Sequence, residues 1–311
     1  MRIDWLWIGF VLAGLFSPAL AQEISTSLPA ELQKTIRELP ANTKVGWAVL
    51  DAKGRIVIEY RAQTDFSAAS SIKTALLWEL FSAYGDQLDQ GGRDDIRDVV
   101  GNPNHPAISH FSPDVQKTIA ADLENVSINN LGSILINFRD LSGRRYSNAT
   151  YNAASNIAIF LLGGPRAVTR RFHAQGANSR QLNLRRYMLT NRLKNGDNTA
   201  TPLALAAIFH QLIGEQPSNL DKKASLAIEN ILYVRDDPQG GRLYAKGGAL
   251  MSNPVTSVRS GRYELDGRVL NYAIMAESKL SPGANGQKQY DQLSQLTLEI
   301  YQSLKRRVLA K

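Results

Sequence analysis

The chain has 311 residues, of which 43% are hydrophobic, 21% are charged and 8% are aromatic, a composition that excludes disordered, collagen-like and coiled-coil proteins. The lack of cysteine excludes disulfides, cysteine-ligated metal centres and a thiol nucleophile. The formal charge is +8, but the basic residues form no stripe or aromatic-interleaved patch, so no nucleic-acid partner is expected.

The N-terminus has the features of a secretory signal. Residues 5–16 form an apolar run, preceded by Arg2 and followed by the small-x-small site Ala19-Leu20-Ala21. A membrane helix is the alternative, but a span needs about 20 apolar residues and this run is shorter. We expect residues 1–21 to be removed before Gln22, which leaves a periplasmic or secreted protein with no stable membrane span.

The first predicted elements are a helix and a hairpin. Apolar side chains recur at helical spacing over residues 31–39, shortly after Pro29. Two β-rich runs follow at residues 45–50 and 55–60, and the turn sequence Asp51-Ala52-Lys53-Gly54 separates them. The chain therefore begins its fold with one helix and two antiparallel strands.

Helical periodicity dominates from residue 70 to about residue 210. Within this block, residues 153–162 are apolar almost all round, which indicates a helix running through the middle of its domain. Gly163-Gly164-Pro165 predicts where that helix ends. The whole block is expected to be helical.

The C-terminal part returns to strands, predicted over residues 242–246, 255–264 and 268–277. Asp266-Gly267 joins the last two as a hairpin. A final helix carries one apolar face, formed by Leu293, Leu296, Ile300, Leu304 and Val308.

This order of elements predicts an α+β fold of the α/β sandwich kind. An antiparallel five-stranded sheet would come from both ends of the chain, flanked by the N- and C-terminal helices, with an all-α domain inserted. The discontinuous sheet domain would comprise residues 22–66 and 215–311, and the inserted helical domain residues 67–214. Linkers are predicted at residues 63–66 and 216–219, and the protein is expected to be a monomer.

Ser70-Ser71-Ile72-Lys73 is the first candidate for chemistry. It places a hydroxyl at the start of a predicted helix and an amine three residues later on the same face. A serine hydroxyl needs a neighbour that accepts its proton, and a desolvated lysine beside other cations can be neutral enough to do so. Ser70 and Lys73 are therefore a candidate nucleophile and base, although this spacing also arises by chance.

Two further motifs add polar groups. Lys246-Gly247-Gly248 follows a predicted strand, where glycines let a ligand approach the backbone and the ammonium can hold an anion. Thr150-Tyr151-Asn152 opens the buried helix and offers a hydroxyl and an amide. Each also has a structural interpretation, as a strand that runs into a glycine turn and as a threonine N-cap.

Together the three motifs resemble the serine β-lactamase and penicillin-binding superfamily, whose signature is S-x-x-K, S-D-N and K-T-G. The class A β-lactamases look closest, because residues 66–70 are similar to the approach to their nucleophile and residues 198–202 to the end of their Ω-loop. Asn156 and residues 163–165 also match their helix spacing. The resemblance covers most of residues 30–305 and implies this fold and a serine hydrolase without a cofactor.

The resemblance implies a role for each matching residue. Ser70 would be the acylated nucleophile, Lys73 its activator, and Thr150 the carrier of a proton to the leaving nitrogen. Asn152 would contact the substrate amide and Lys246 would lie near the substrate carboxylate.

The backbone completes the implied site. Gly248 and Ala249 would bind the substrate through the main chain. The N–H groups of Ser70 and Ala249 would form the oxyanion hole that stabilises the tetrahedral intermediate.

The chain departs from the class A pattern at four places. Thr150 replaces a serine and keeps the hydroxyl, while Tyr151 replaces an aspartate, as in some penicillin-binding relatives. Gly247 replaces a hydroxyl residue, which removes one hydrogen bond to the substrate carboxylate. The largest departure is that residues 171–201 lack the Ω-loop glutamate with which class A enzymes activate the deacylating water.

Arg185 or Arg186 falls where that glutamate is expected, and Asp197 is the single acid of the loop. Six basic residues share the loop, namely Arg171, Arg180, Arg185, Arg186, Arg192 and Lys194. Such a run favours a solvated structural loop over an anion-binding surface. Without a base to activate water, an acyl-enzyme would form and persist.

Ser127-Ile128-Asn129 is an alternative second motif, and it lies nearer the distance expected from Ser70. It lacks a following buried helix, and Ser127 is better interpreted as an N-cap. Thr150 is therefore preferred, which implies loop insertions between the first and second motifs.

The leading functional interpretation is an exported serine hydrolase of class A β-lactamase type, which opens a β-lactam or related amide through acyl-Ser70. Its partner would be a small-molecule β-lactam or a cell-wall peptide. The alternatives are a D-Ala-D-Ala peptidase or esterase, favoured by Tyr151 and the missing glutamate, and a non-hydrolytic penicillin-binding or sensing module. The four histidines lack metal-ligand spacing, so no metal is expected.

Overall fold

The computed structural model describes residues 30–309, except residue 41, residues 214–219 and residues 237–239. The predicted signal at residues 1–21 and the predicted linker at residues 216–219 lie outside the described residues. No helix in this described part is both long enough and apolar enough to cross a membrane.

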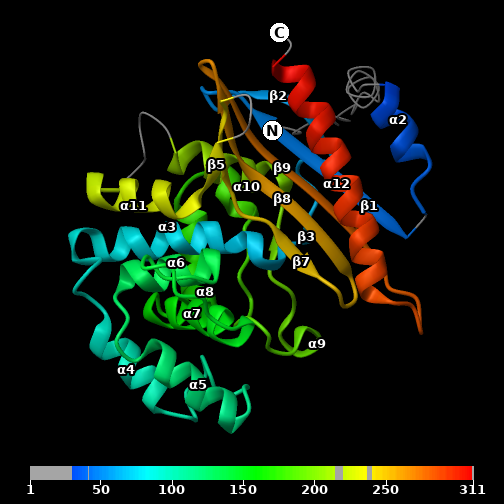
Figure 1. Cartoon of the computed structure of the whole chain (residues 1–311). Helices are drawn as coiled ribbons and strands as arrows, with labels where there is room; N and C mark the ends of the chain where they lie inside the picture. Colours follow the sequence, from blue (N-terminus) through cyan, green and yellow to red (C-terminus); the bar gives the residue numbers. More distant parts are fainter. Residues whose placement is uncertain (1–29, 41, 214–219, 237–239, 310–311) are drawn as a thin grey trace, which may run out of the picture.

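One half of the molecule is an antiparallel sheet, which has seven strands in the described chain (Figure 1). Its order is β2-β1-β9-β8-β6-β5, and β7 also pairs with β8. The strands are β1 (Thr43–Leu50), β2 (Ile56–Tyr60), β5 (Tyr233–Asp236), β6 (Arg242–Ala245), β7 (Gly248–Leu250), β8 (Val255–Leu265) and β9 (Arg268–Ser278). All five predicted strands are present.

The predicted number of five strands is too low, because β5 and β7 also join the sheet. β5 has four residues, all exposed, and β7 has three. Neither strand is long enough for the period-two pattern of buried and exposed residues by which strands are recognised in a sequence.

The central strands are buried on both faces. Along β1, Trp47 and Val49 join a cluster with the C-terminal helix, whereas Ala48 and Leu50 join the larger core on the other face. Alternate side chains of a strand point to opposite faces, so a strand with two covered faces reads as a continuous apolar run. This explains why residues 45–50 contain so few polar side chains.

Helices cover the two faces of the sheet differently (Figure 1). The C-terminal helix α12 (Gly286–Leu309) packs on β8 and β9, and α2 (Ala30–Arg37) lies on the same face. On the opposite face, α10 (Pro202–Leu212) packs against β1, β8 and β9. The predicted flanking helices are therefore both present.

The inserted block is helical, as predicted, and lies beside one end of the sheet (Figure 1). Its main helices are α3 (Lys73–Tyr84), α4 (Arg93–Gly101), α5 (Pro113–Leu123), α6 (Ile128–Asn137), α7 (Asn148–Leu161) and α8 (Pro165–Ala174). α11 (Lys222–Leu232) follows the predicted block in sequence but packs against α3 and α6. α7 is buried from Thr150 to Ile159, which is the predicted central helix. The exact domain boundaries stay a prediction.

Candidate active site

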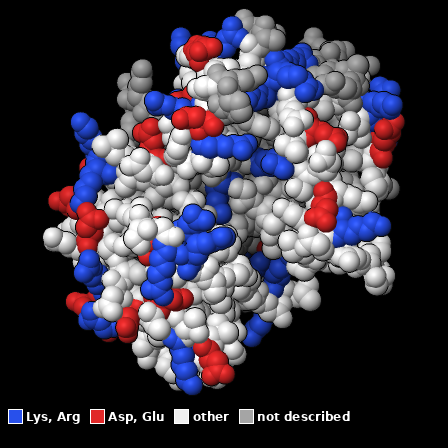
Figure 2. All heavy atoms as spheres, viewed as in Figure 1, with Lys and Arg blue, Asp and Glu red and all other residues white. Residues whose placement is uncertain are grey.

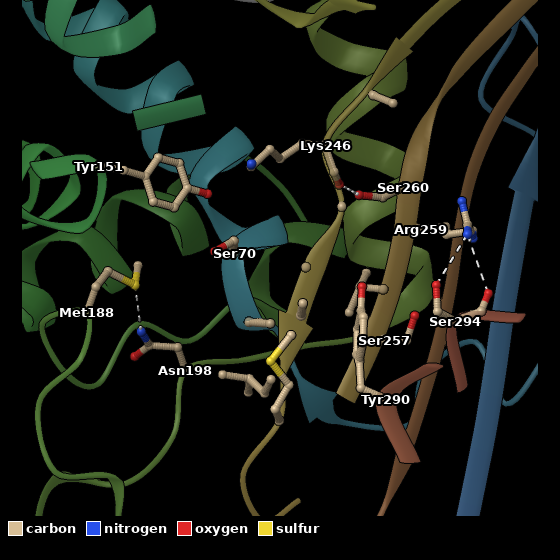
Figure 3. Close-up of a pocket in the computed structure, with 18 of the residues that line it drawn as sticks. Ser70, Tyr151, Met188, Asn198, Lys246, Ser257, Arg259, Ser260, Tyr290 and Ser294 are labelled. Atoms are coloured by element: carbon tan, nitrogen blue, oxygen red, sulfur yellow. Dashed lines mark hydrogen bonds between the residues drawn. The ribbon is translucent and has the colours of Figure 1, made fainter. Parts of the chain in front are cut away.

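Ser70 lies in a cavity of about 1060 Å³ between the sheet and the helical block. The same cavity is lined by four more of the predicted residues, Asn152, Lys246, Gly248 and Ala249. Figure 3 shows Ser70, Tyr151 and Lys246 together at this site, although they come from different elements. The fold thus brings the first and third sequence motifs together.

The turn before α3 presents Ser70 to the cavity. Ser70 belongs to the 3-10 helix η1 (Ala69–Ile72), and α3 begins only at Lys73. Ala69 has a φ of 48°, a left-handed conformation that is uncommon for a residue with a side chain. Such strain persists where the surrounding structure enforces it, and it is frequent at functional sites.

Strand β7 passes close to this turn, which explains a glycine of the third motif. A Cβ atom on Gly248 would lie 2.9 Å from the Cβ of Ala69 and 3.0 Å from the carbonyl oxygen of Ala68. Only glycine allows this approach without a shift. It places the neighbouring Ala249 in the same cavity wall as Ser70.

Lys73 is completely buried beside the nucleophile. Its Nζ donates a hydrogen bond to Oδ1 of Asn152 at 3.1 Å and lies 3.1 Å from the centroid of the Tyr151 ring. Burial, and then the positive charge of Lys246, hold the pKa of Lys73 well below the usual lysine value. No carboxylate of the described residues pairs with it, so the neutral amine is favoured.

Lys246 is held by the end of a helix. Its Nζ donates to the carbonyl oxygen of Ile136 at 2.7 Å, in the last turn of α6. The carbonyls of that turn lack partners within the helix and carry partial negative charge, so they suit an ammonium group. Burial lowers the pKa of Lys246 to about 8, and its Nζ lies 5.1 Å from the Tyr151 ring.

Tyr151 lines the cavity, although the sequence marks it only as a departure from the family motif. Phe138 stacks on its ring with centroids 3.5 Å apart and planes 8° apart. The Lys73 Nζ at 3.1 Å must lie on the opposite face, because the two groups cannot occupy one side of the ring at these distances. The hydroxyl reaches the Ser70 region (Figure 3). Burial raises the pKa of Tyr151 to about 12, and a hydrogen bond with Ser70 acts in the opposite direction.

The structure does not bring Thr150 to the cavity. α7 begins at Asn148, and Ser147 is its N-cap, whose hydroxyl accepts the N–H of Thr150. Thr150 therefore lies in the first helical turn, where its buried hydroxyl donates to Asp122 at 2.8 Å. The expected proton carrier faces α5, and the neighbouring Tyr151 takes the place beside Ser70.

Ser127, the alternative start of the second motif, is an N-cap. Its hydroxyl accepts the N–H of Asn130 at the start of α6, which confirms the predicted N-cap. This bond satisfies one of the free N–H groups of the first turn.

The single acid of the Ω-loop is fully engaged. Asp197 accepts hydrogen bonds from Arg186 at 3.0 Å, Arg192 at 2.6 Å and the Ser67 hydroxyl at 2.5 Å. Burial works to raise the pKa of Asp197, but the Ser67 hydrogen bond and the two guanidinium groups outweigh it and lower the pKa. The carboxylate therefore stays ionised, with both oxygens occupied.

Arg186 is one of the two arginines that fall where the family resemblance implies the deacylating glutamate. It lines the cavity with a nearly buried side chain, whereas Arg185 is exposed. Basic side chains also gather over the middle of the molecular face in Figure 2. Among the described residues, no group of three side chains is arranged to ligate a metal ion.

Known structures share this architecture. No family model matches the sequence. The chain is similar to an ancestral (GNCA) class A β-lactamase, with 21% identity and a TM-score of 0.57 over 87% of this chain and 97% of that one. It is also similar to a β-lactamase from Desulfarculus baarsii DSM 2075, with 19% identity and a TM-score of 0.57 over 88% of this chain and 93% of that one. The protein therefore has the fold of the class A β-lactamases.

Proposed function

We propose that this protein is a serine acyl-enzyme that opens a β-lactam or a related amide through an ester on Ser70. The observation that carries this proposal is the fully buried Lys73, which lies one helical turn from Ser70 and has no acidic partner in the described chain. A neutral amine in this position can accept the serine proton. The β-lactamase names of the similar structures support the same substrate class.

The proposed acylation needs a proton acceptor, an oxyanion hole and a proton donor in addition to the nucleophile. Oγ of Ser70 attacks the amide carbon as its proton moves to the neutral amine of Lys73. The backbone N–H groups of Ser70 and Ala249 stabilise the oxyanion. When the C–N bond breaks, the leaving nitrogen takes a proton from the Tyr151 hydroxyl, which regains one from Lys73. Asn152 positions Lys73 and is available to the substrate amide.

Lys246 supplies positive charge to the same cavity. Its ammonium lies beside Tyr151 and at the end of α6, and a substrate carboxylate is the partner that the family resemblance implies for it. A carboxylate would have to share the ammonium with the carbonyl oxygen of Ile136.

Slow deacylation is the second part of the proposal. Hydrolysis of the ester needs an activated water, and Asp197 has both oxygens occupied by Arg186, Arg192 and Ser67. The engagement of both Asp197 oxygens favours a second candidate function, in which the protein is a penicillin-binding peptidase or sensor whose acyl-enzyme persists.

A chromogenic cephalosporin separates the two candidates. A lactamase gives many turnovers per protein, whereas a persistent acyl-enzyme gives one stoichiometric burst. Intact mass spectrometry should show the acyl adduct, and peptide mapping should place it on Ser70. A protein that gains no acyl mass contradicts both candidates.

Two variants test the assigned base. Lys73→Met keeps an apolar stem and removes the proton acceptor, so acylation should fall at least about 10²-fold. Ser71→Ala is the matched control, because the Ser71 hydroxyl donates to the carbonyl of Ala68 and is buried away from the cavity. Equal losses in the two variants would contradict Lys73 as the base.

We also propose that the protein acts after export. The apolar run at residues 5–16 and the small-x-small site before Gln22 support this. The mass of the protein recovered from a periplasmic extract should correspond to a chain that starts at Gln22. Recovery of the full-length chain in the cytoplasm alone would contradict export.

A further inference from the structure

The cavity that holds Ser70 continues to the other side of strand β7. Its lining includes Ser257 and Arg259 of β8 and Tyr290 and Ser294 of α12. Figure 3 shows these four residues across the β7 ribbon from Ser70. We call this part the outer groove, and it lies on the face of the sheet that α12 covers.

Strand alternation confirms which face Arg259 occupies. Val255 and Tyr263 of β8 pack in the cluster beneath α12, and residues of the same parity along a strand share a face. Arg259 accordingly donates from Nε to the Thr297 hydroxyl of α12 at 3.2 Å. The nucleophile lies on the opposite side of the β7 strand.

A second arginine reaches the same face. Arg235 of β5 is paired with Leu243 of β6, and directly opposite residues of an antiparallel pair point to the same side. Leu243 packs against the cluster beneath α12, so Arg235 shares this face. Both Arg235 and Leu243 line the cavity.

Neither arginine is neutralised within the described chain. No described carboxylate lies within ion-pair distance of Arg235 or Arg259. The contacts of Arg259 Nη2 with Ser294, at 3.4 and 3.5 Å, are long for hydrogen bonds. Asp197, the single acid in the cavity lining, is engaged by the Ω-loop arginines.

The remaining lining of the outer groove is mostly aromatic and aliphatic. Tyr272, Tyr290, Leu298 and Tyr301 contribute to it beside Leu243. Ligand sites commonly combine such a lining with a few polar groups that fix orientation. Unpaired guanidinium groups select carboxylates, to which they donate two parallel hydrogen bonds.

We propose that the outer groove binds a small amphipathic anion, a carboxylate on an aromatic or aliphatic body. Arg259 holds the acid group, Arg235 adds positive charge at the β5 edge of the groove, and the tyrosines and leucines pack against the body. This site is separate from the Ser70 side of β7 and does not depend on acyl transfer. The ligand contacts β8, the strand that pairs with the Ala249 strand.

Isothermal titration of the whole protein with 4-phenylbutanoate and with neutral 4-phenylbutanamide tests the proposal. The acid should bind at least about tenfold more tightly than the amide, since its charge-assisted hydrogen bonds are roughly twice as strong as neutral ones. Arg259→Gln should weaken the acid about tenfold, and Arg259→Lys should restore part of the affinity. Arg235→Gln should weaken it severalfold, and this exposed residue can be changed without disturbing α12.

Two further variants serve as controls. Arg268→Gln removes an exposed arginine outside this cavity and should leave affinity unchanged. Lys246→Gln removes the cation on the Ser70 side and should also leave affinity for the acid unchanged. Equal binding of acid and amide, no binding of the acid, or loss of affinity in Lys246→Gln without loss in Arg235→Gln would overturn the proposal.

Discussion

At the scale of single residues, the direction in which a side chain points matters to the site as much as its chemical identity. Thr150 and Tyr151 are neighbours in one helical turn, yet one hydroxyl binds Asp122 and the other reaches Ser70. Successive residues of a helix point in directions about 100° apart, so a shift of one residue in register changes which side chain enters the site. The motif located the turn but could not choose between the two hydroxyls.

Tyr151→Phe and Thr150→Val should therefore behave differently. Tyr151→Phe keeps the ring between Phe138 and Lys73 but removes the hydroxyl, so the rate of Ser70 acylation should fall about 10²-fold. Thr150→Val should keep acylation and cost about 1–3 kcal/mol of stability, because the partly buried Asp122 carboxylate loses a charge-assisted hydrogen bond. Stopped-flow acylation and urea unfolding measure the two effects. A larger acylation loss in Thr150→Val than in Tyr151→Phe would restore Thr150 as the proton carrier.

Glu79 is a buried acid that the proposed chemistry does not use. It lies in α3 and accepts a hydrogen bond from Gln175 at 2.8 Å, with Arg171 4.0 Å away. Burial raises the pKa of Glu79 in the folded protein. The unfolded state therefore loses this proton first, and the stability of the fold decreases as pH rises through the ordinary glutamate range toward the raised pKa.

Glu79→Gln should remove this dependence and stabilise the protein at neutral pH. Glutamine keeps an acceptor for Gln175 and carries no charge into the core. The pair with the half-exposed Arg171 is long and contributes little. Thermal unfolding of both proteins at pH 4 and pH 7 measures the difference. A lower melting temperature of the variant at pH 7 would show that the Arg171 pair outweighs burial.

At the scale of elements, helix ends and loops build much of the site. The end of α6 provides the Ile136 carbonyl for Lys246 and the Phe138 ring for Tyr151. Phe138 is the C-cap of this helix with a φ of 59°, so a left-handed residue with a bulky side chain supports the site. The Ω-loop in turn is held together by Asp197, whose carboxylate binds Arg186 and Arg192.

Asp197→Asn tests the role of that carboxylate. The partly buried acid holds two arginines, so its loss should cost on the order of 1–3 kcal/mol, less than for a fully buried pair. The pKa of Asp197 is lowered in the fold, so its stabilisation is complete above the ordinary aspartate range and disappears as pH falls through the lowered pKa. Urea unfolding at pH 7 and at pH 3 should show this loss in the wild type and its absence in the variant. A deacylation rate that collapses in Asp197→Asn would instead identify Asp197 as the base.

At the scale of the whole molecule, the site forms where the sheet meets the helical block. Ser70 lies among the first residues of the helical block, Lys246 lies between β6 and β7, and Tyr151 lies in the central helix α7. Sites at such junctions depend on how closely the two halves approach. β7 approaches the nucleophile turn so closely at Gly248 that an added Cβ would meet Ala69 and the backbone of Ser71.

Gly248→Ala should push β7 away from the nucleophile turn. The new Cβ would lie 2.9 Å from the Cβ of Ala69 and 3.0 Å from the N of Ser71, so the strand must shift at a cost of about 1–3 kcal/mol. Acylation should fall at least about tenfold, because the Ala249 N–H moves with the strand. Gly101→Ala is the control, since nothing lies within 4 Å of its added Cβ. Acylation that survives in Gly248→Ala would place the oxyanion donors elsewhere.

The sequence alone determined the local elements with the longest patterns. The apolar periods of residues 45–60, 153–162 and 255–277 predicted strands and the central helix correctly. The family motifs predicted Ser70, Lys73 and Lys246 as site residues, and the structure places Ser70 and Lys246 in one cavity. Local propensity and spacing are properties of neighbouring residues, so they are readable without the fold.

Only the tertiary structure decided which side chains meet. β5 and β7 become strands because β6 and β8 pair with them, and their own patterns are too short to show it. Tyr151 packs between Phe138 and Lys73, Asp197 binds two arginines, and Arg235 and Arg259 line one cavity, so each of these arrangements joins residues that are apart in sequence. Such contacts depend on helix register and strand parity across the whole molecule. The sequence therefore identifies the chemical groups of the site, but tertiary packing determines where each side chain points.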